Sequence, residues 1–224
     1  MWVISHPDDV TDEELRGLDR VFAASAVWAE QAGRRAGVPV LPLLQCTDPQ
    51  RFRPGAAPPG SGDRVLFVGN SRNVFRPAVR DLLAAGVDVA IYGDKWDRFL
   101  GPGRVRGRFV PNERLAAAYA GAGVVLNDHW DDMREQGFYS NRLFDAAACG
   151  ARIVSDRIPG LEELFGGLAR TFADAGELVA LVRAAPAGFP DDARRAELAK
   201  LVAAEHSFDA RARTLLDEAL ALRA

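Results

Sequence analysis

The chain has 224 residues, a hydrophobic content of 48% and a net charge of −3 at pH 7, with acidic and basic residues intermixed. This content is enough for a buried core, and the mixed charges give no footprint for binding nucleic acid. We see no signal peptide and no apolar run long enough to span a membrane, and two cysteines fit a reducing compartment, so we expect a cytoplasmic protein.

The first fifty residues predict part of an α/β domain. Apolar runs alternate there with helical patterns, which is typical of a parallel α/β layer fold. Strands are expected at residues 2–5, 19–25 and 38–44, and helices at residues 12–18 and 27–36. Three strands are too few for a complete domain of this kind, so we interpret residues 1–50 as a partial N-terminal domain.

A linker and a second α/β domain follow. Seven of the ten residues from Arg53 to Gly62 are Pro, Gly or Ser, so we expect residues 51–62 to connect two domains. The layered pattern then restarts over residues 63–224 with about four parallel strands. The expected strands are residues 64–68, 87–92, 123–126 and 152–155, with 108–110 as a further candidate, and the expected helices are 77–85, 112–120, 141–149, 161–165, 175–184, 191–204 and 208–222.

The segment from Gly137 to Asp156 is the most informative part of the sequence. It predicts a turn, a short helix that Ser140 or Asn141 caps and that Gly150 ends, and then a buried strand. The free N–H groups at such a helix start suit an anion, above all a phosphate. Asn141 and Asp145 are four residues apart and share one helix face. The carboxylate suits a neutral diol such as ribose.

The stretch Asp145-Ala-Ala-Ala-Cys-Gly150 resembles the Glu-Ala-x-Ala-x-Gly donor motif of GT-B glycosyltransferases. The turn before it is most similar to the Ser-Asn-Arg-Leu-Phe-Glu turn of the CgeB-like bacterial branch. Residues 43–54 also resemble the crossover between the two GT-B domains. Asp replaces the usual Glu, and Glu135 misses the usual spacing of the first acidic residue, so we assign Glu135 no role.

The resemblance implies a nucleotide-sugar site in a Rossmann-like C-terminal domain. It places the turn with Tyr139 and Ser140 at the donor phosphates and Asp145 on the ribose. The Gly69-Asn70 turn after the first strand of that domain borders the phosphates, and either Arg72 or Arg76 contacts them. The alternative to a phosphate-binding role is that this segment is only a tight turn with arginines on the surface.

Histidines near strand ends are further candidates. His129 lies in a loop that resembles the branch's Asn-Asp-His-Trp and is a candidate donor to the sugar or a phosphate; a structural loop histidine is the alternative. His6 and, less specifically, Ser25 follow strands of the first segment and are candidate substrate contacts. Three acidic residues crowd the His129 loop without convincing ligand spacing, so we expect no metal site.

These features predict a GT-B glycosyltransferase that moves a sugar from a nucleotide-diphosphate donor to an acceptor, with retention and without a metal. No cofactor beyond the donor is implied. Because roughly the first half of the N-terminal domain is missing, the alternative is a silent or truncated nucleotide-sugar-binding module that acts with a partner chain, or self-associates. A third interpretation is a sugar-nucleotide epimerase of the same fold, but this sequence lacks the acidic and histidine signatures of that family.

Overall fold

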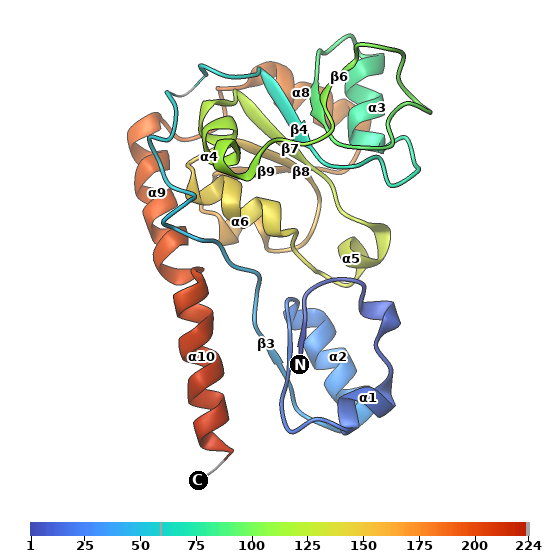
Figure 1. Ribbon diagram of the computed structural model, residues 1–224, viewed down its shortest axis with the longest axis vertical. Coiled ribbons are helices and arrows are strands. Elements are labelled where there is room, and N and C mark those ends of the chain that lie inside the picture. The colour runs from blue at the N-terminus through green and yellow to red at the C-terminus, as the bar shows by residue number, and fades with distance from the viewer. Residues whose placement is uncertain (59, 223–224) are drawn as a thin grey trace.

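The computed structural model describes residues 1–58 and 60–222, which form two parallel β-sheets joined by a linker (Figure 1). The smaller sheet has the strand order β1-β2-β3. Its elements are β1 (Trp2–Val3), the 3-10 helix η1 (Pro7–Asp9), α1 (Asp12–Arg16), β2 (Val21–Ala23), α2 (Ala26–Ala36) and β3 (Val40–Pro42). The parallel α/β layering predicted for residues 1–50 is present, with shorter strands than expected.

Capping explains one of these shorter strands. The predicted strand 19–25 ends at Ala23 because Ser25 caps α2, and its hydroxyl accepts a hydrogen bond from the Trp28 N–H at 3.1 Å. Helix α2 then packs its buried Trp28 and Ala32 against the strands. Because Ser25 caps the helix, the small residues after Ala23 belong to the start of α2 rather than to the strand.

The larger sheet has six parallel strands in the order β6-β5-β4-β7-β8-β9. The strands are β4 (Val65–Val68), β5 (Ala90–Tyr92), β6 (Val105–Gly107), β7 (Val124–Asn127), β8 (Ile153–Asp156) and β9 (Ala169–Phe172). Strands β4 to β6 progress towards one edge and β7 to β9 towards the other. The order therefore reverses between β4 and β7, which is where doubly wound sheets bind ligands.

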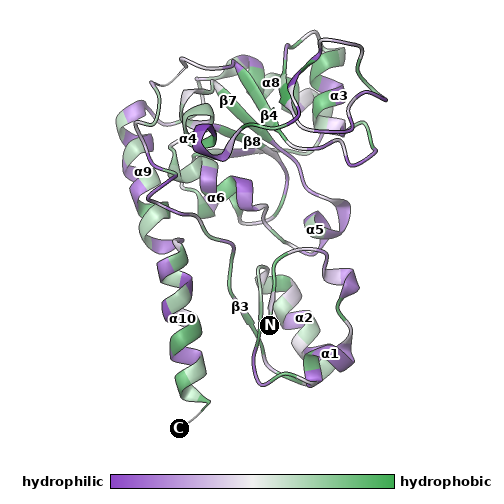
Figure 2. Cartoon of the chain, viewed as in Figure 1, coloured by the Kyte–Doolittle hydropathy of each residue, from purple (hydrophilic) through white to green (hydrophobic). Residues whose placement is uncertain are grey.

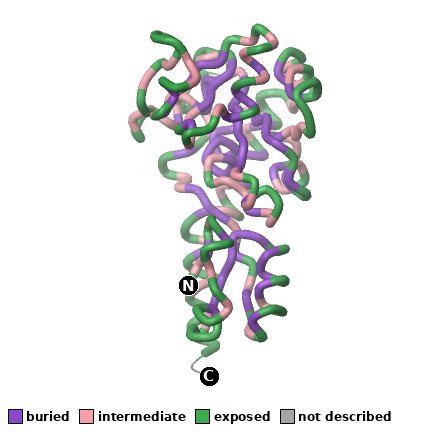
Figure 3. Tube along the Cα trace, turned by 90° about the vertical axis from the view of Figure 1, so that its right-hand side faces the viewer, coloured by how far each residue is buried: buried purple, intermediate pink, exposed green. Residues whose placement is uncertain are grey.

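Helices cover both faces of this sheet. Helices α3 and α8 pack together over one face, whereas α4, α6 and α9 cover the other. Figure 3 shows that the buried segments run through the middle of the larger domain. The helices that follow β4 are α3 (Pro77–Ala84), α4 (Asn112–Gly121), α5 (Asp131–Glu135), α6 (Asn141–Ala148), α7 (Leu161–Leu164), α8 (Ala175–Ala184), α9 (Asp192–Glu205) and α10 (Phe208–Ala221).

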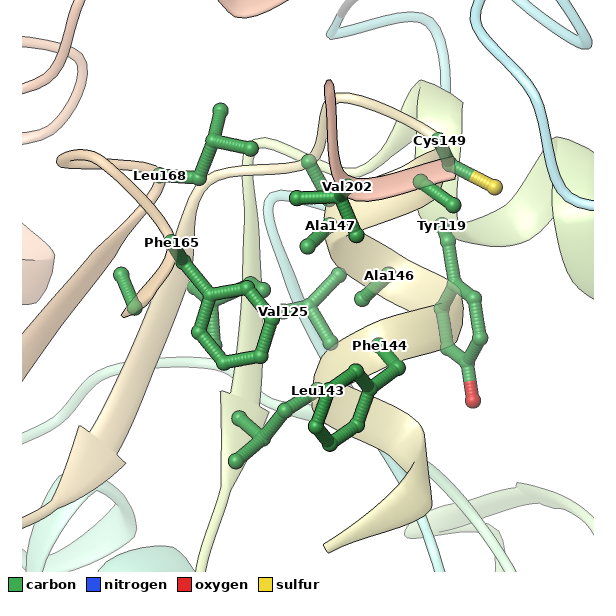
Figure 4. Close-up of a cluster of buried hydrophobic side chains, with 14 of the residues drawn as sticks. Tyr119, Val125, Leu143, Phe144, Ala146, Ala147, Cys149, Phe165, Leu168 and Val202 are labelled. Carbon is green, nitrogen blue, oxygen red and sulfur yellow. The ribbon is translucent and has the colours of Figure 1, made fainter. Parts of the chain in front are cut away.

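The predicted motif helix is α6, and it is anchored by its apolar face. Leu143, Phe144 and Ala147 are fully buried, and Figure 4 shows them in a cluster with Val125 of β7 and Phe165. Gly150 follows the helix with a φ of 71°, a left-handed conformation that favours glycine. This packing fixes where the start of α6 lies relative to the strand ends.

In the larger domain, three elements differ from the sequence prediction. The strand expected at residues 108–110 lies at Val105–Gly107, β9 was not predicted, and α5 forms inside an expected loop. Strands β6 and β9 are the two edges of the sheet, and only Ala169 of β9 is buried, so neither carries a strong apolar signal. The sheet therefore has six strands where about four were predicted.

The junction of α9 and α10 binds the segment that follows β3, just before the linker. The backbone of Thr47 accepts from Phe208 N and donates to His206 O, and Arg211 donates to the carbonyls of Leu44 and Gln45. Helix α10 then runs along the side of the small domain (Figure 1), where Arg20 and Glu218 form an ion pair of 3.1 Å.

Most of α10 is exposed. Only Arg211 of this helix is buried, and Figure 2 shows hydrophobic residues distributed along it. Leu216 and Leu220 are 58% and 55% exposed. Within residues 1–58 and 60–222, no helix has the length and apolar character of a membrane-spanning segment.

Candidate functional site

Two loops and one helix start meet where the strand order reverses. The loop after β4 carries residues 69–76, the loop after β7 carries residues 128–130, and α6 begins beside them at Asn141. We call this region the switch-point crevice. It contains most of the residues that the sequence singled out, and their contacts decide which of them are available to a ligand.

Arg76 is tied to Asp128 at the bottom of the crevice. Its Nε donates to Asp128 Oδ2 at 2.8 Å and its Nη2 donates to Oδ1, while Nη1 donates to the Asn70 carbonyl at 3.1 Å. The two side chains are 4% and 8% exposed. Arg76 therefore joins the loop after β4 to the loop after β7, and its charge is already balanced.

Arg72 and Arg142 have no carboxylate within ion-pair distance in the part of the chain that the structure describes. Arg72 lies over the Trp130 ring at 4.1 Å, and Arg142 Nη1 donates to the neutral Asn127 Oδ1 at 2.8 Å. Both are half-buried. Burial and then the charge of Arg142 lower the pKa of Arg72 to about 10. Two half-buried cations that lack a carboxylate within ion-pair distance would be stabilised by a bound anion.

The glycine at position 69 makes room for Arg142. A Cβ atom placed on Gly69 would lie 3.0 Å from Arg142 Nη2. Arg142 is the second residue of α6, so the motif helix brings its own guanidinium across to the turn after β4. The sequence reasoning missed Arg142, although it lies inside the Ser-Asn-Arg-Leu-Phe resemblance.

His129 is held entirely by the protein. Its Nδ1 is 2.6 Å from Asp156 Oδ1, its backbone N–H donates to Asp156 Oδ2, and its Nε2 accepts the Ser140 N–H at 3.0 Å. The Asp156 carboxylate thus sets the tautomer, with the proton on Nδ1. Its side chain is 0% exposed. The contacts favour the structural alternative for His129, which positions the start of α6 through Ser140.

Burial of Asp156 opposes its charge, but the hydrogen bonds from His129 outweigh burial and lower the pKa of Asp156. The carboxylate therefore stays charged beneath the crevice. Since His129 is neutral with its proton on Nδ1, the pair keeps one negative charge, which favours the charged form of Arg72.

Asn141 and Asp145 lie on one face of α6, as predicted. Asn141 Nδ2 donates to Asp145 Oδ2 at 3.0 Å, and the Thr47 hydroxyl donates to Asp145 Oδ1 at 2.8 Å. Ser140 is the N-cap residue by its backbone, but its side chain makes no capping hydrogen bond. Asp145 is only 9% exposed, and burial raises its pKa to about 7.

This raised pKa predicts a pH dependence of stability. Since folded Asp145 holds a proton from its ordinary pKa of 3.8 up to about 7, the protein should lose stability as pH rises through that window. The loss is at most about 1.4 kcal/mol per pH unit. In urea unfolding from pH 4 to 7, Asp145→Asn should remove this part of the slope; parallel curves for the two proteins would show that Asp145 titrates normally.

The other predicted residues occupy different places. Asn70 Oδ1 accepts from the Asp94 N–H at 2.7 Å, and the Tyr139 hydroxyl donates to the Pro159 carbonyl at 2.7 Å. Ser25 is fully buried, where it caps α2 and donates to the Gln136 carbonyl at 2.6 Å. His6 is exposed, has a φ of 50°, and lies 3.8 Å from Asp132 Oδ2.

A cavity of 220 Å³ lies between the two domains, and we call it the interdomain cavity. It brings together five predicted residues, which are His6, Arg72, His129, Ser140 and Asn141. The predicted residues that do not line it are Ser25, Gly69, Asn70, Arg76, Tyr139 and Asp145. Trp130 forms part of its wall and was named in the sequence only as a possible packing partner of His129.

Comparison with known proteins fits this geometry. A family described as glycosyl transferase-like matches residues 69–217, which include the crevice loops and α6. The chain belongs to this glycosyltransferase-like family. A comparison with curated proteins gives no match.

Solved structures show that the fold is of the GT-B type. Sucrose-phosphate synthase from Thermosynechococcus elongatus has a TM-score of 0.63 and 18% identity over 98% of this chain and 64% of its own. AviGT4, a glycosyltransferase involved in avilamycin A biosynthesis, has a TM-score of 0.62 and 19% identity over 90% and 64%. The GtfA/B complex gives 0.64 and 12% over 96% and 48%. The chain thus spans about half to two-thirds of these relatives.

Proposed function

We propose that this chain binds a nucleoside diphosphate sugar in the switch-point crevice and transfers the sugar to an acceptor hydroxyl. The observation that carries the proposal is the pair Arg72 and Arg142, two half-buried guanidiniums without a carboxylate partner beside the start of α6. Guanidiniums bind phosphate by charge-assisted hydrogen bonds, and a helix start adds N–H donors. The diphosphate would lie between them.

In the proposed reaction, an acceptor oxygen forms a bond to the anomeric carbon while the bond from that carbon to the diphosphate oxygen breaks. The electron pair stays on the nucleoside diphosphate, and the hydroxyl proton passes to its leaving oxygen. Arg72, Arg142 and the α6 N–H groups stabilise the charge that grows there. We also propose that the chain belongs to the CgeB-like branch and that the transfer retains the anomeric configuration and needs no metal. Cys46 and Cys149 are free and buried, which supports a location in the reducing cytoplasm.

Asp145 is proposed to bind the ribose. Above its raised pKa of about 7, where the Asp145 carboxylate is charged, we expect Asp145→Ala to weaken binding of a nucleoside diphosphate by about 1–3 kcal/mol, as for loss of a hydrogen bond to a charged group. Thr47→Val is the matched control, because it removes the Thr47–Asp145 hydrogen bond and leaves the carboxylate.

Calorimetric titration with UDP, GDP, ADP and dTDP in excess EDTA measures both variants. Equal losses in Asp145→Ala and Thr47→Val would assign Asp145 a purely structural role. Binding that disappears in EDTA and returns with magnesium would overturn the metal-independent part of the proposal.

A second candidate is a nucleotide-sugar-binding module that acts with a partner chain. The small sheet has only three strands, and exposed Leu216 and Leu220 lie on α10. One similar structure is of a complex, GtfA/B. Uncovered apolar surface and open strand edges favour association.

We therefore expect a dimer or larger species by light scattering, and little sugar transfer by the isolated chain. Leu216→Glu together with Leu220→Glu should shift the mass towards the monomer. A clean monomer with robust transfer activity would contradict this second candidate and leave the donor site as proposed.

A further inference from the structure

Asn127 is a fully buried residue at the end of β7, and its amide holds the guanidinium of Arg142. Asn127 Oδ1 accepts a hydrogen bond from Arg142 Nη1 at 2.8 Å, and Asn127 Nδ2 donates to Ser155 Oγ at 2.9 Å. Asn127 and Ser155 are register partners in the pairing of β7 with β8, so the sheet fixes where the amide lies. Because arginine only donates hydrogen bonds, the amide oxygen is the end that contacts it.

The amide belongs to a ring of hydrogen bonds that starts and ends on α6. The Ser155 hydroxyl, which accepts from the amide, donates to Asp156 Oδ1 at 3.0 Å. Asp156 also accepts from His129 Nδ1, and His129 Nε2 accepts the Ser140 N–H. The ring therefore joins Arg142, in the first turn of α6, to the N-cap residue of the same helix. Hydrogen bonds that close on one another in this way hold the guanidinium in one place beside the helix start.

The groups that hold Arg142 are all neutral in the part of the chain that the structure describes. Besides the Asn127 amide, the Phe67 ring lies 5.5 Å from the guanidinium carbon, and the buried Tyr119 is nearby. Burial raises the pKa of Tyr119 to about 12, so its hydroxyl stays uncharged at neutral pH. These neighbours orient the guanidinium and leave it without a carboxylate in contact, which is the state in which it can pair with a phosphate.

The next residue in the sequence shows what a carboxylate does at this place. Asp128 pairs with Arg76 through both of its oxygens, so the charge of Arg76 is balanced. Aspartate has nearly the same shape as asparagine, and at position 127 it would pair with Arg142 in the same way. The choice of an amide or a carboxylate at this position therefore determines whether Arg142 keeps a free charge.

We propose that Asn127 is a positioning residue that sets the charge of the donor site, because it orients Arg142 towards the diphosphate without neutralising it. The inference rests on the proposed function, since it requires Arg142 to bind the donor. Asn127 acts through Arg142 and does not itself touch the donor. An acidic residue at this position would turn the anion site into a closed ion pair.

Two sets of variants test this role, with pyrophosphate and with UDP, GDP, ADP and dTDP as probes in calorimetric titration at pH 8. The first set adds a charge. We expect Asn127→Asp to weaken binding of these anions by about 10- to 100-fold, because the added carboxylate pairs with Arg142 and repels the ligand. Asn127→Ala should lose less affinity than Asn127→Asp. Asn112→Asp adds the same charge at an exposed residue in the first turn of α4 and should bind like the wild-type protein.

The second set is a double-mutant cycle, which needs no buried charge. Asn127→Ala should weaken binding in the wild-type background but cause no further loss in the Arg142→Ala background, since Asn127 acts only through Arg142. Urea unfolding measures the stability of each variant separately. A purely structural role would instead lower affinity and stability together in both backgrounds.

An Asn127→Asp variant that binds as tightly as Asn127→Ala, or losses of affinity that add in the cycle, would overturn the role of Asn127. Binding of pyrophosphate without binding of any nucleotide would overturn the proposed function, and pyrophosphate alone would then report on Asn127. A wild-type protein that binds neither kind of probe would contradict both.

Discussion

Replacing Arg72 with Ala is expected to weaken nucleoside diphosphate binding by about 10- to 100-fold, which is the effect of losing a hydrogen bond to a charged group. The same replacement should not destabilise the fold. Arg72 forms no ion pair with the residues that the structure describes, and burial and Arg142 already disfavour its charge. Removing Arg72 relieves its repulsion from Arg142 but also removes its contact with the Trp130 ring, so the free energy of unfolding should change by less than about 1 kcal/mol.

Arg142→Ala should weaken binding to a similar degree, and the double variant should bind no nucleotide detectably. Arg80→Ala is the control, because Arg80 is an exposed arginine on α3 that pairs with Asp81. Calorimetry measures affinity, and urea unfolding measures stability. Arg72→Ala that binds normally, or that loses stability in proportion to affinity, would show that Arg72 is a structural residue.

Unlike Arg72→Ala, Arg76→Met is expected to destabilise the fold. The free energy of unfolding should fall by about 3–5 kcal/mol, because the variant leaves the Asp128 carboxylate buried and unpaired. Asp128 is only 6% exposed, so water can replace the lost guanidinium only in part. The Asn70 carbonyl also loses its donor. The sequence could not choose between Arg72 and Arg76, and this contrast separates them.

The double variant Arg76→Met, Asp128→Leu should recover much of that stability, since replacing both members of a buried pair with apolar residues is often neutral. Urea unfolding of the two single variants and the double variant gives the coupling energy. Single variants that each lose less than about 1 kcal/mol would mean that the pair is hydrated and does not join the two loops.

The sequence predicted the elements with strong local signals. Helix α6 was placed correctly because Ser140, the buried Leu143 and Phe144 and the positive φ of Gly150 mark its start, core face and end. The edge strand β9 was missed because its order depends on pairing with β8 rather than on its own composition. Elements that depend on distant partners are invisible to a local pattern.

The candidate site was predicted as a set of residues but not as a set of contacts. The resemblance singled out His129 and Asp145. The residues that hydrogen-bond to them are distant in sequence, since Asp156 lies 27 residues from His129 and Thr47 lies 98 residues from Asp145. The sequence offered no signal for these pairings. Arg142 was visible inside the motif but was not given a role, because only the fold shows that it reaches the Gly69 turn.

The most direct test of the donor site is a crystal structure of the chain with the nucleoside diphosphate that binds most tightly, grown in EDTA. The diphosphate is predicted to lie between the guanidiniums of Arg72 and Arg142 at the first N–H groups of α6, with Arg76 still paired to Asp128. A diphosphate that is bound elsewhere, or that contacts neither Arg72 nor Arg142, would contradict the proposed donor site.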